Sequence, residues 1–420
     1  MSGTRDLLAR REKLLGRNMS LFYNDPVHLV KGEGVWLWDA DGRQYLDCYN
    51  NVPHVGHCHP RVVEAIYQQA STLNTHTRYL HEGILDYVDR LTATFDPSLD
   101  TAILTCTGSE ANDVALRMAQ AVTGKTGVIA TDFTYHGNTT AVSQLSTRMP
   151  PVGGYGGHVP APDAYRPLGG EPDEAFAKAW AYQVEQAIAS LQDSPFGFSA
   201  LIIDPFFVNE GFPDLPDGFL ASAVTAVRKA GGLVIADEVQ PGFGRTGTHM
   251  WGHQKAGIVP DVVTLGKPMA NGHPVGAVVA GSDTLNAFRK AFRYFNTFGG
   301  NPVSCAAAAA VLDVLEDEQL QANACVIGAY ARQGLQMLAE KHSLIGNVRG
   351  SGLFFGAELV LDRQEKTPAA EVATRVINEM RQRGVLMGKL GIRQNVTKIR
   401  PPLPFSKENA DLMLSAVDCH

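Results

Sequence analysis

The spacing of apolar and polar positions changes several times along the chain. Two short apolar runs flank Asp41-Gly42 within residues 35–47, which predicts a β-hairpin. Apolar residues at helical spacing follow at 62–70 and 84–94. Further on, short apolar runs predict strands at 102–106, 127–130, 201–204, 233–237, 262–265 and 277–280. Helical stretches lie between several of them, notably at 110–120 and 219–229. This alternation predicts an α/β fold with a mostly parallel sheet covered by helices on both faces.

Outside the alternating region, the composition marks connections and a second domain. Residues 150–170 are rich in Pro and Gly, which predicts a long surface loop or an insertion. The Ala-rich stretch 306–315 predicts a long helix that leads out of the sheet, and mixed patterns return at 344–417. We therefore expect an N-terminal segment that joins a small α+β domain, a large domain, and the C-terminal small domain, at residues 1–60, 61–304 and 305–420.

Composition narrows the class of protein. The chain has 420 residues, of which 45% are hydrophobic and 19% charged, as expected for a globular protein with a large core. The net charge of -7 and the absence of long basic runs argue against a nucleic-acid partner. No uninterrupted apolar stretch is long enough to span a bilayer. The N-terminus carries Asp6 and Glu12 and has no apolar signal core, so we expect a cytoplasmic protein. Six dispersed cysteines without a CxxC pair predict buried thiols, not disulfides.

Several motifs suggest chemistry that their context does not support. Residues 242–247 match GxGxxG, but two acids and a glutamine separate the preceding strand from the glycines, and no helix pattern follows. Gly124-Lys125-Thr126 resembles the end of a P-loop, but Ala119 stands where that motif needs glycine. The sequence contains no GxSxG serine-hydrolase motif. A cluster of histidines in a turn suggests a metal site, although a structural or pocket-lining role is favoured and we expect no metal; the cluster is His54, His57 and His59.

Three features, by contrast, fit one kind of site. Residues 107–112, between a strand and a helix, offer glycine and free helix N-terminal N–H groups to an anion, although they would also serve as a plain helix cap. A buried strand ends at Asp237, where a carboxylate could keep a pyridine nitrogen protonated or simply be solvated. Another strand is followed by Lys267, where burial would favour a neutral amine. An anion cradle, an acid and a lysine at one sheet edge are what a pyridoxal phosphate site requires.

The residues that carry these features also resemble a known family. From about Leu29 to the C-terminus, the chain is similar to the class III aminotransferases, which have the type I fold of enzymes that use pyridoxal 5'-phosphate. The matching stretches are TGSEAN, FTYHG, IADEVQPGFGRTG, TLGKPMANGHPVGAVV and FNTFGGNPVSCAAA.

The resemblance implies a role for each matching residue. Lys267 would form the Schiff base and later move a proton at the reacting carbon, while Asp237 would pair with the pyridine nitrogen. Residues that would bind the phosphate, stack on the ring or approach its hydroxyl are Gly108, Ser109, Tyr135, His136, Val239 and Gln240. Thr297 matches a residue that reaches the cofactor of the neighbouring subunit, which implies a homodimer with shared active sites. Whether two dimers pair into a tetramer stays open.

Three departures from the family's pattern concern the substrate. Lys398 takes the place of an arginine that commonly clamps a substrate carboxylate, and Arg400 follows two residues later, with a structural role as the alternative. Glu210 matches an acid that often neutralises that arginine, so an ion pair between Glu210 and Lys398 is one expectation. Residues 49–60 resemble a subgroup with ethanolamine-phosphate and phosphohydroxylysine phospholyases, in which Lys398, Arg400, Arg78 and the histidines would hold a substrate phosphate. Loops near Tyr23, Tyr79 and residues 206–210 would shape the pocket.

The resemblance leaves two reactions open. The family's commonest chemistry favours transfer of an amino group from an amine or ω-amino donor to a 2-keto acid. The close alternative is a lyase that eliminates ammonia and phosphate from an amino-alcohol phosphate, or acts on a hydroxy-aminophosphonate. A racemase or aminomutase is less favoured. A non-catalytic scaffold is the remaining alternative, against which the joint presence of Lys267, Asp237, Tyr135 and Thr297 argues.

Overall fold

A seven-stranded sheet forms the centre of the protein in this computed structural model, which describes residues 4–16, 19–148, 156–168, 170 and 174–418. In spatial order its strands are β4 (Thr101–Thr105), β10 (Gly276–Ala280), β9 (Val262–Leu265), β8 (Leu233–Asp237), β7 (Phe198–Ile203), β5 (Gly127–Thr131) and β6 (Gly156–Val159). All neighbours are parallel except β10, which is antiparallel to both β4 and β9. The carboxyl ends of β4, β8 and β9 therefore lie at the same edge of the sheet.

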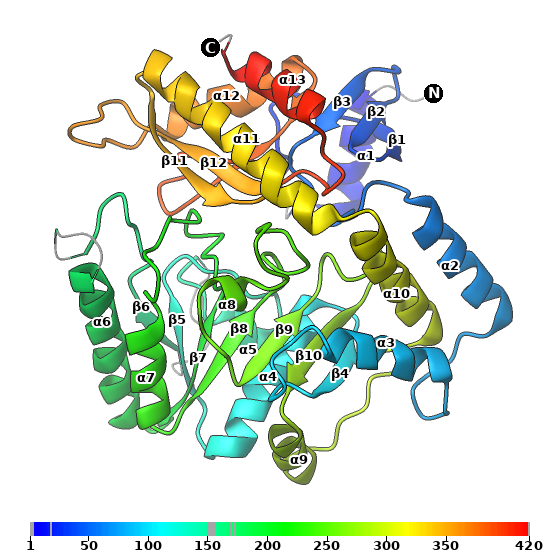
Figure 1. Cartoon of the computed structure of the whole chain (residues 1–420), viewed down its shortest axis with the longest axis vertical. Coiled ribbons are helices and arrows are strands. Elements are labelled where there is room, and N and C mark those ends of the chain that lie inside the picture. The colour runs from blue at the N-terminus through cyan, green and yellow to red at the C-terminus, as the bar shows by residue number, and fades with distance from the viewer. Residues whose placement is uncertain (1–3, 17–18, 149–155, 169, 171–173, 419–420) are drawn as a thin grey trace.

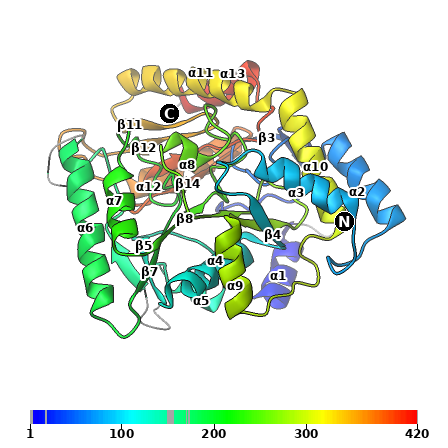
Figure 2. The ribbon, with the colours of Figure 1, turned by 60° about the horizontal axis from the view of Figure 1, so that its bottom comes forward.

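Helices cover both faces of this sheet, as the sequence predicts. Along β7, Leu201 and Ile203 pack with α6 (Glu174–Gln192) and α7 (Ala221–Lys229). Ile202, between them, packs on the opposite face with α4 (Gly108–Thr123). Because successive side chains of a strand point to opposite faces, a fully apolar strand needs a cover on each side. Figures 1 and 2 show the sheet enclosed in this way.

The remaining helices surround the sheet or lead away from it. Their bounds are α1 (Thr4–Leu15), α2 (Pro60–Thr72), α3 (Glu82–Thr92), α5 (Thr140–Ser143), α8 (Gly252–Lys255), α9 (Ser282–Ala291), α10 (Pro302–Asp317) and α11 (Leu320–Lys341). The Ala-rich helix α10 is followed directly by α11, which crosses the second layer of the molecule at the top of Figure 1. The expected helix out of the sheet region is confirmed.

Two small sheets form that second layer. One contains β1 (Leu29–Glu33), β2 (Trp36–Asp39), β3 (Gln44–Asp47) and β13 (Val385–Leu386). The other contains β11 (Ile345–Ser351), β12 (Phe354–Leu359), β15 (Val396–Lys398) and β14 (Gly388–Leu390), with α12 (Ala370–Gln382) and α13 (Lys407–Asp418) beside them. The β2–β3 hairpin is confirmed, and β3 pairs in parallel with β13, so both ends of the chain contribute to this layer. The domain boundaries at residues 60 and 304 stay a prediction.

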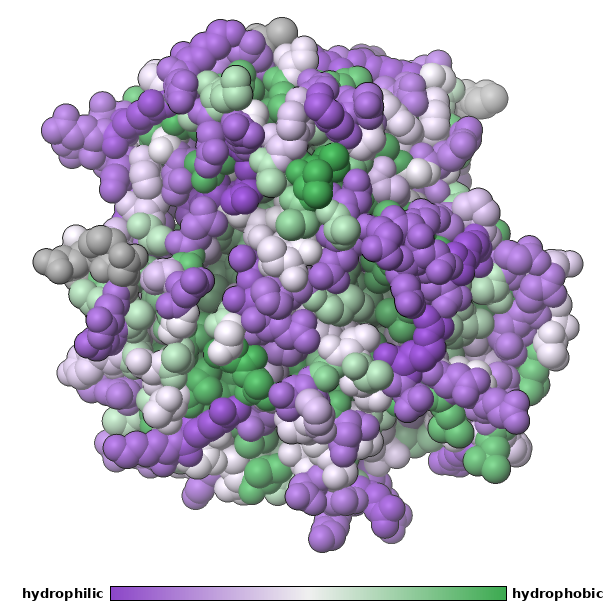
Figure 3. Space-filling view, viewed as in Figure 1, coloured by the Kyte–Doolittle hydropathy of each residue, from purple (hydrophilic) through white to green (hydrophobic). Residues whose placement is uncertain are grey.

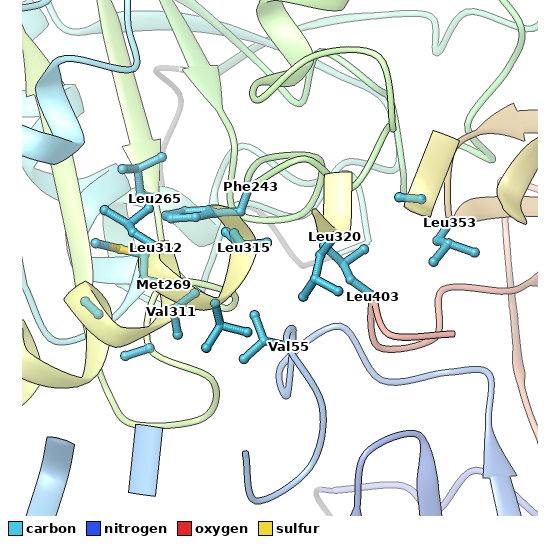
Figure 4. Packing of buried hydrophobic residues seen from close by; sticks show 14 of the residues in the cluster. Val55, Phe243, Leu265, Met269, Val311, Leu312, Leu315, Leu320, Leu353 and Leu403 are labelled. Carbon is cyan, nitrogen blue, oxygen red and sulfur yellow. The ribbon is translucent and has the colours of Figure 1, made fainter. Parts of the chain in front are cut away.

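A continuous apolar core joins the two layers. Figure 4 shows Leu265 of the central sheet and Phe243 near Leu312 and Leu315 of α10, with Leu353 and Leu403 further along. Each such side chain contributes about 1.5–3 kcal/mol on burial. A site between the layers is therefore held by packing from both.

The structure corrects two expectations. Within residues 150–170, Gly156–Val159 form strand β6 at the sheet edge because their backbone pairs with β5; residues 150–155 and 169 lie outside the described residues. Cys48 and Cys305 are buried as expected, but Cys58 and Cys325 are exposed and Cys106 is half-buried. The exposure of each cysteine depends on how the segment that carries it packs against the rest of the protein. Cys419 lies outside the described residues. Hydrophilic residues cover most of the face in Figure 3, with small apolar patches. No helix in the described ranges is long and apolar enough to cross a membrane.

Candidate active site

A cavity opens at the shared edge of β4, β8 and β9. Its lining residues are Thr107, Gly108, Ser109, Tyr135, His136, Gly137, Asp204, Asp237, Val239, Gln240 and Lys267. The strand ends thus bring together every residue that the sequence assigns to the cofactor, except Thr297. Asp204 and Gly137 were not among the assigned residues. Asp204 follows β7 directly, and its place after a buried apolar strand was the signal available in the sequence.

The first turn of α4 is built to leave backbone N–H groups free for an anion. Thr107 caps the helix by accepting a hydrogen bond from Glu110 N at 3.1 Å, and Glu110 accepts from Cys106 N at 2.8 Å. The capping residue is therefore Thr107, and Ser109 accepts instead from Asn138 N at 3.2 Å. A Cβ on Gly137, whose φ is +139°, would lie 2.5 Å from Ser109 Oγ. Glycine is needed there for the loop to approach the helix N-terminus.

Three hydrogen-bonding contacts hold the carboxylate of Asp237, which lines the cavity. Its Oδ2 lies 2.9 Å from Asn112 Nδ2 and 2.7 Å from His136 Nδ1, and its Oδ1 accepts from Val239 N at 3.0 Å. The other ring nitrogen of His136 lies 2.9 Å from Thr134 Oγ1. These contacts fix the carboxylate in one orientation. Sequence reasoning missed Asn112, although it lies one turn after Gly108 on the cavity side of α4.

Lys267 lines the cavity beyond the end of β9. Burial lowers the pKa of its amine, the positive charge of Arg400 lowers it further, and Asp237 and Asp204 act in the opposite direction. Among the described residues, none forms a hydrogen bond with its amine. Lys267 thus presents an amine with a bias toward the neutral, nucleophilic form.

Two further cations lie beside this cavity. Lys398 is buried, and its amine has neither a hydrogen bond nor an ion pair with any residue the structure describes. Its nearest aromatic neighbour is Tyr49, whose ring centre lies 5.8 Å from Nζ. Arg400 donates from Nη1 to Gln240 Oε1 at 2.5 Å and from Nε to the carbonyl of Tyr49 at 2.8 Å. Burial lowers the pKa of Lys398 well below its usual value, and the charges of Arg400 and Lys267 lower it further.

Glu210 does not pair with Lys398. It is buried and bonds through Oε1 to Thr131 Oγ1, while its Oε2 has no partner among the described residues. Burial raises the pKa of Glu210, and it raises that of Asp204 well above the usual range. Both carboxyls are thereby biased toward their neutral forms. The expected ion pair is absent because the Glu210 side chain turns toward β5, which leaves Lys398 without a counter-ion.

Besides Glu210, Lys398 and Arg400, three more predicted site residues lie outside the cavity lining. Tyr23 is half-buried in the N-terminal layer, where its hydroxyl donates to Met387 O at 2.9 Å and burial raises its pKa. Arg78 and Thr297 lie on exposed loops, and Arg78 stacks on Phe295 with its guanidinium carbon 4.0 Å from the ring centre. Within one chain, neither Arg78 nor Thr297 reaches the cavity.

The three clustered histidines have three separate partners. His54 Nε2 lies 2.7 Å from Phe243 O, and its Nδ1 faces the buried Arg245 at 3.0 Å. His57 Nε2 lies 2.7 Å from Asp47 Oδ2, and His59 Nε2 lies 3.0 Å from Glu318 Oε1. Burial lowers the pKa of His54 well below its usual value, so it is neutral. Among the described ranges, no cluster of three metal-ligating side chains occurs.

The fold and site define an α/β enzyme that carries an anion cradle, an oriented carboxylate and a half-buried amine at one sheet edge. The chain belongs to the class III aminotransferase family, whose model, "Aminotransferase class-III", matches residues 22–418. It is 41% identical over 419 residues to "Alanine--glyoxylate aminotransferase 2-like" of Drosophila melanogaster, which covers 96% of this chain and 84% of that protein. It is 36% identical over 432 residues to "Ethanolamine-phosphate phospho-lyase homolog 1" of Caenorhabditis elegans, with coverages of 98% and 92%.

A solved structure extends the comparison. A phospholyase from Arthrobacter, in complex with phosphoethanolamine, is 46% identical and superposes with a TM-score of 0.95 over 99% of both chains. Membership of the family implies pyridoxal phosphate as the cofactor. The cavity fits that group, because the free N–H groups of α4, the held Asp237 carboxylate and the unbonded Lys267 amine suit its phosphate, ring nitrogen and aldehyde.

Proposed function

We propose that this protein is a pyridoxal-phosphate-dependent lyase that releases phosphate and ammonia from a small amino-alcohol phosphate. The observation that carries the proposal is that Lys398, a buried residue beside the Lys267 cavity, has an amine without a hydrogen bond or ion pair to any described residue. A buried cation without a counter-ion is costly, and it is retained where a ligand supplies the missing charge.

The cofactor would be held by residues of this chain that line the cavity. Gly108 and Ser109 would donate backbone N–H groups, and Ser109 its hydroxyl, to the phosphate. Tyr135 and Val239 would lie against the two faces of the ring, with His136 behind the Asp237 carboxylate. When bound, the cofactor supplies a protonated ring that accepts the electron pair left by a carbon–hydrogen bond.

The charge balance beside the cavity favours a dianionic substrate. Asp204 and Glu210 are biased toward neutral forms, and Asp237 is committed to His136 and Asn112. Lys398 and Lys267 therefore have no free carboxylate to oppose them. A phosphate dianion beside Lys398 would favour its ammonium form and form charge-assisted hydrogen bonds with it. A lysine serves as a point charge for phosphate, whereas a planar carboxylate is better matched by the fork of an arginine.

The reaction then follows from the positions of the side chains. Lys267 removes the proton from the carbon that bears the amine, since its neutral form is favoured. The C–O bond to phosphate breaks, and the electron pair leaves with the phosphate, which Lys398 stabilises. Lys267 returns its proton to the carbon that carried the phosphate, and water then displaces the amino group as ammonia. One carbonyl compound, one ammonia and one phosphate are formed from each substrate and one water.

The second candidate is amino transfer to a 2-keto acid. It is supported by the 41% identity with the aminotransferase 2-like relative, because both reactions begin with the same proton removal. The absence of an arginine at position 398 weakens it, since a keto-acid carboxylate would meet a lysine there.

We also propose that the protein acts as a homodimer. Thr297 and Arg78 lie on exposed loops next to the exposed aromatic residues Tyr79 and Phe298. An exposed apolar patch of this kind is typical of a protein interface. Across a two-fold axis, Thr297 would reach the partner's cofactor phosphate. A cytoplasmic location stays a prediction from the N-terminal sequence.

A half-reaction followed by visible absorbance separates the two chemistries. The cofactor-loaded protein is mixed with phosphoethanolamine, or with a panel of ω-amino acids, in the absence of a keto acid. A lyase returns to its starting spectrum and releases ammonia. Stable bleaching that only a keto acid reverses would identify an aminotransferase and overturn the proposal.

A further inference from the structure

Arg400 lies at the junction between the cofactor cavity and the Lys398 side of the site. It is buried, and its guanidinium stacks over the ring of Tyr49 with 4.8 Å between the guanidinium carbon and the ring centre. Its Nη1 donates to Gln240 Oε1 at 2.5 Å, and its Nε donates to the carbonyl of Tyr49 at 2.8 Å. Its orientation is therefore fixed by contacts on two edges and on one face.

The contact with Gln240 has a consequence for the cavity. A guanidinium has only donors, so the amide group of Gln240 must turn its oxygen toward Arg400. The Nε2 group is then left to face the cavity, which Gln240 lines. An amide held in this way offers two N–H donors and no acceptor to whatever oxygen lies in front of it, such as the ring hydroxyl of the cofactor.

Tyr49 links the same arginine to Lys398. The Tyr49 ring faces Arg400 and Lys398, and Phe22 packs on it with 4.6 Å between ring centres. A Cβ on Gly388 would lie 2.7 Å from Tyr49 Cε2, so the ring fits only because residue 388 is glycine. Tyr49 thus forms a platform that carries both cations.

The charge of Arg400 acts on the lysines on either side of it. It lowers the pKa of Lys267 and of Lys398. Asp237 and Asp204 face Lys267 with the opposite effect; Asp204 also opposes the shift of Lys398, while Arg148 adds to it. Arg400 therefore has two separable properties, its charge and its hydrogen bond to Gln240.

We propose that Arg400 is a positioning residue that orients the Gln240 amide toward the cofactor, while Lys398 alone of these two cations binds the substrate phosphate. This inference rests on the proposed function for the identity of the substrate. It revises the sequence-based expectation that Arg400 holds the phosphate, because two of the five N–H donors of Arg400, on Nε and Nη1, bind the carbonyl of Tyr49 and Gln240 Oε1 and fix the guanidinium as a support for the amide.

Three variants separate these roles: Arg400→Lys keeps the charge and loses the Gln240 geometry, Arg400→Met loses both, and Lys398→Met removes the predicted phosphate ligand. Binding of inorganic phosphate to the cofactor-loaded proteins is measured by calorimetry. We expect Lys398→Met to weaken it about 10- to 100-fold, the loss of a charged hydrogen bond. Both Arg400 variants should change the affinity for phosphate by less than about threefold, as expected for a residue that does not contact the ligand.

The visible spectrum of the bound cofactor is the second readout. We expect its maximum to shift in both Arg400 variants, because Gln240 is no longer held. The pH midpoint of the band should rise by about one unit in Arg400→Met and stay near the wild-type value in Arg400→Lys. Arg400→Lys keeps a positive charge at this buried position, so it provides the test if Arg400→Met fails to fold.

Two results would overturn the inference. One is a loss of phosphate binding in Arg400→Lys as large as that in Lys398→Met, which would make Arg400 a phosphate ligand. The other is an unchanged absorption maximum in both Arg400 variants. Failure of the proposed function would give a different result: the wild-type protein would bind phosphate but release none from phosphoethanolamine.

Discussion

Replacing Lys398 by methionine should stabilise the fold while removing the phosphate site. Lys398 is buried without a hydrogen bond or ion pair to the described residues, and its pKa lies well below the usual value. The folded protein thus binds fewer protons at this position than the unfolded chain. Above the pKa of about 10.4 that a lysine has in the unfolded chain, Lys398 is neutral in both states and does not lower the unfolding free energy. As the pH drops from there toward the lower folded pKa, the unfolded chain takes up the proton first, so the unfolding free energy falls.

The size of this effect follows from proton linkage. Each pH unit within that window costs the wild type about 1.4 kcal/mol of unfolding free energy. Between about pH 9.5 and about pH 7.5, the unfolding free energy of the wild type should therefore fall relative to that of Lys398→Met, by about 1.4 kcal/mol for each pH unit that lies above the folded pKa. The cost has no counterpart in the variant, because methionine fills a similar volume without a charge.

The assay is urea unfolding of the cofactor-free proteins at both pH values and one protein concentration. Lys389→Met is the matched control: Lys389 lies on the neighbouring strand and burial lowers its pKa too, but it donates to Thr374 Oγ1 at 2.6 Å, so its loss should stabilise the fold less than the loss of Lys398. Added inorganic phosphate should stabilise the wild type more than Lys398→Met. Equal pH slopes in wild type and Lys398→Met would refute the reasoning.

Further predictions concern the cofactor and the contact between the layers. Asp237→Asn should lower the rate about 100- to 1,000-fold in steady-state assays while His136 and Asn112 keep the side chain in place; an unchanged rate would exclude Asp237 as the ring partner. Gly137→Ala should weaken cofactor retention on dialysis, since its Cβ would lie 2.5 Å from Ser109 Oγ. Arg166→Ala should lower the thermal midpoint, because it breaks a 2.7 Å ion pair with buried Glu358. The difference in midpoint between wild type and variant is measured at low salt and in 1 M salt. A difference at low salt no larger than that in 1 M salt would argue against a contribution from that pair.

Much of the fold follows from local patterns. The apolar runs that end at Asp237 and before Lys267 are short, rich in β-branched residues and bounded by glycine or polar residues. The strands that they predict agree within a residue with β8 and β9. Residues 156–159, in contrast, carry Gly-Gly-His-Val, which has no strand signal of its own. They form β6 because the exposed edge of β5 needs a partner, and that requirement is tertiary.

The site was predictable where chemistry depends on strand ends and unpredictable where it depends on side-chain direction. Lys267, Asp237 and Ser109 follow from the topology of one sheet edge. The direction of Glu210 does not, since only the folded structure brings Thr131 within reach of it. Likewise, the contact of Arg400 with Gln240 joins residues 160 positions apart, and no local pattern reports it.

The most direct test of the central claim is the phosphate yield per enzyme from phosphoethanolamine with no keto acid present. A lyase regenerates its cofactor in every cycle, so we expect many phosphates per active site, with ammonia in equal amount and a sharp loss in Lys398→Met. A yield of no phosphate, with the cofactor converted once and restored only by a keto acid, would contradict the account and identify amino transfer as the reaction.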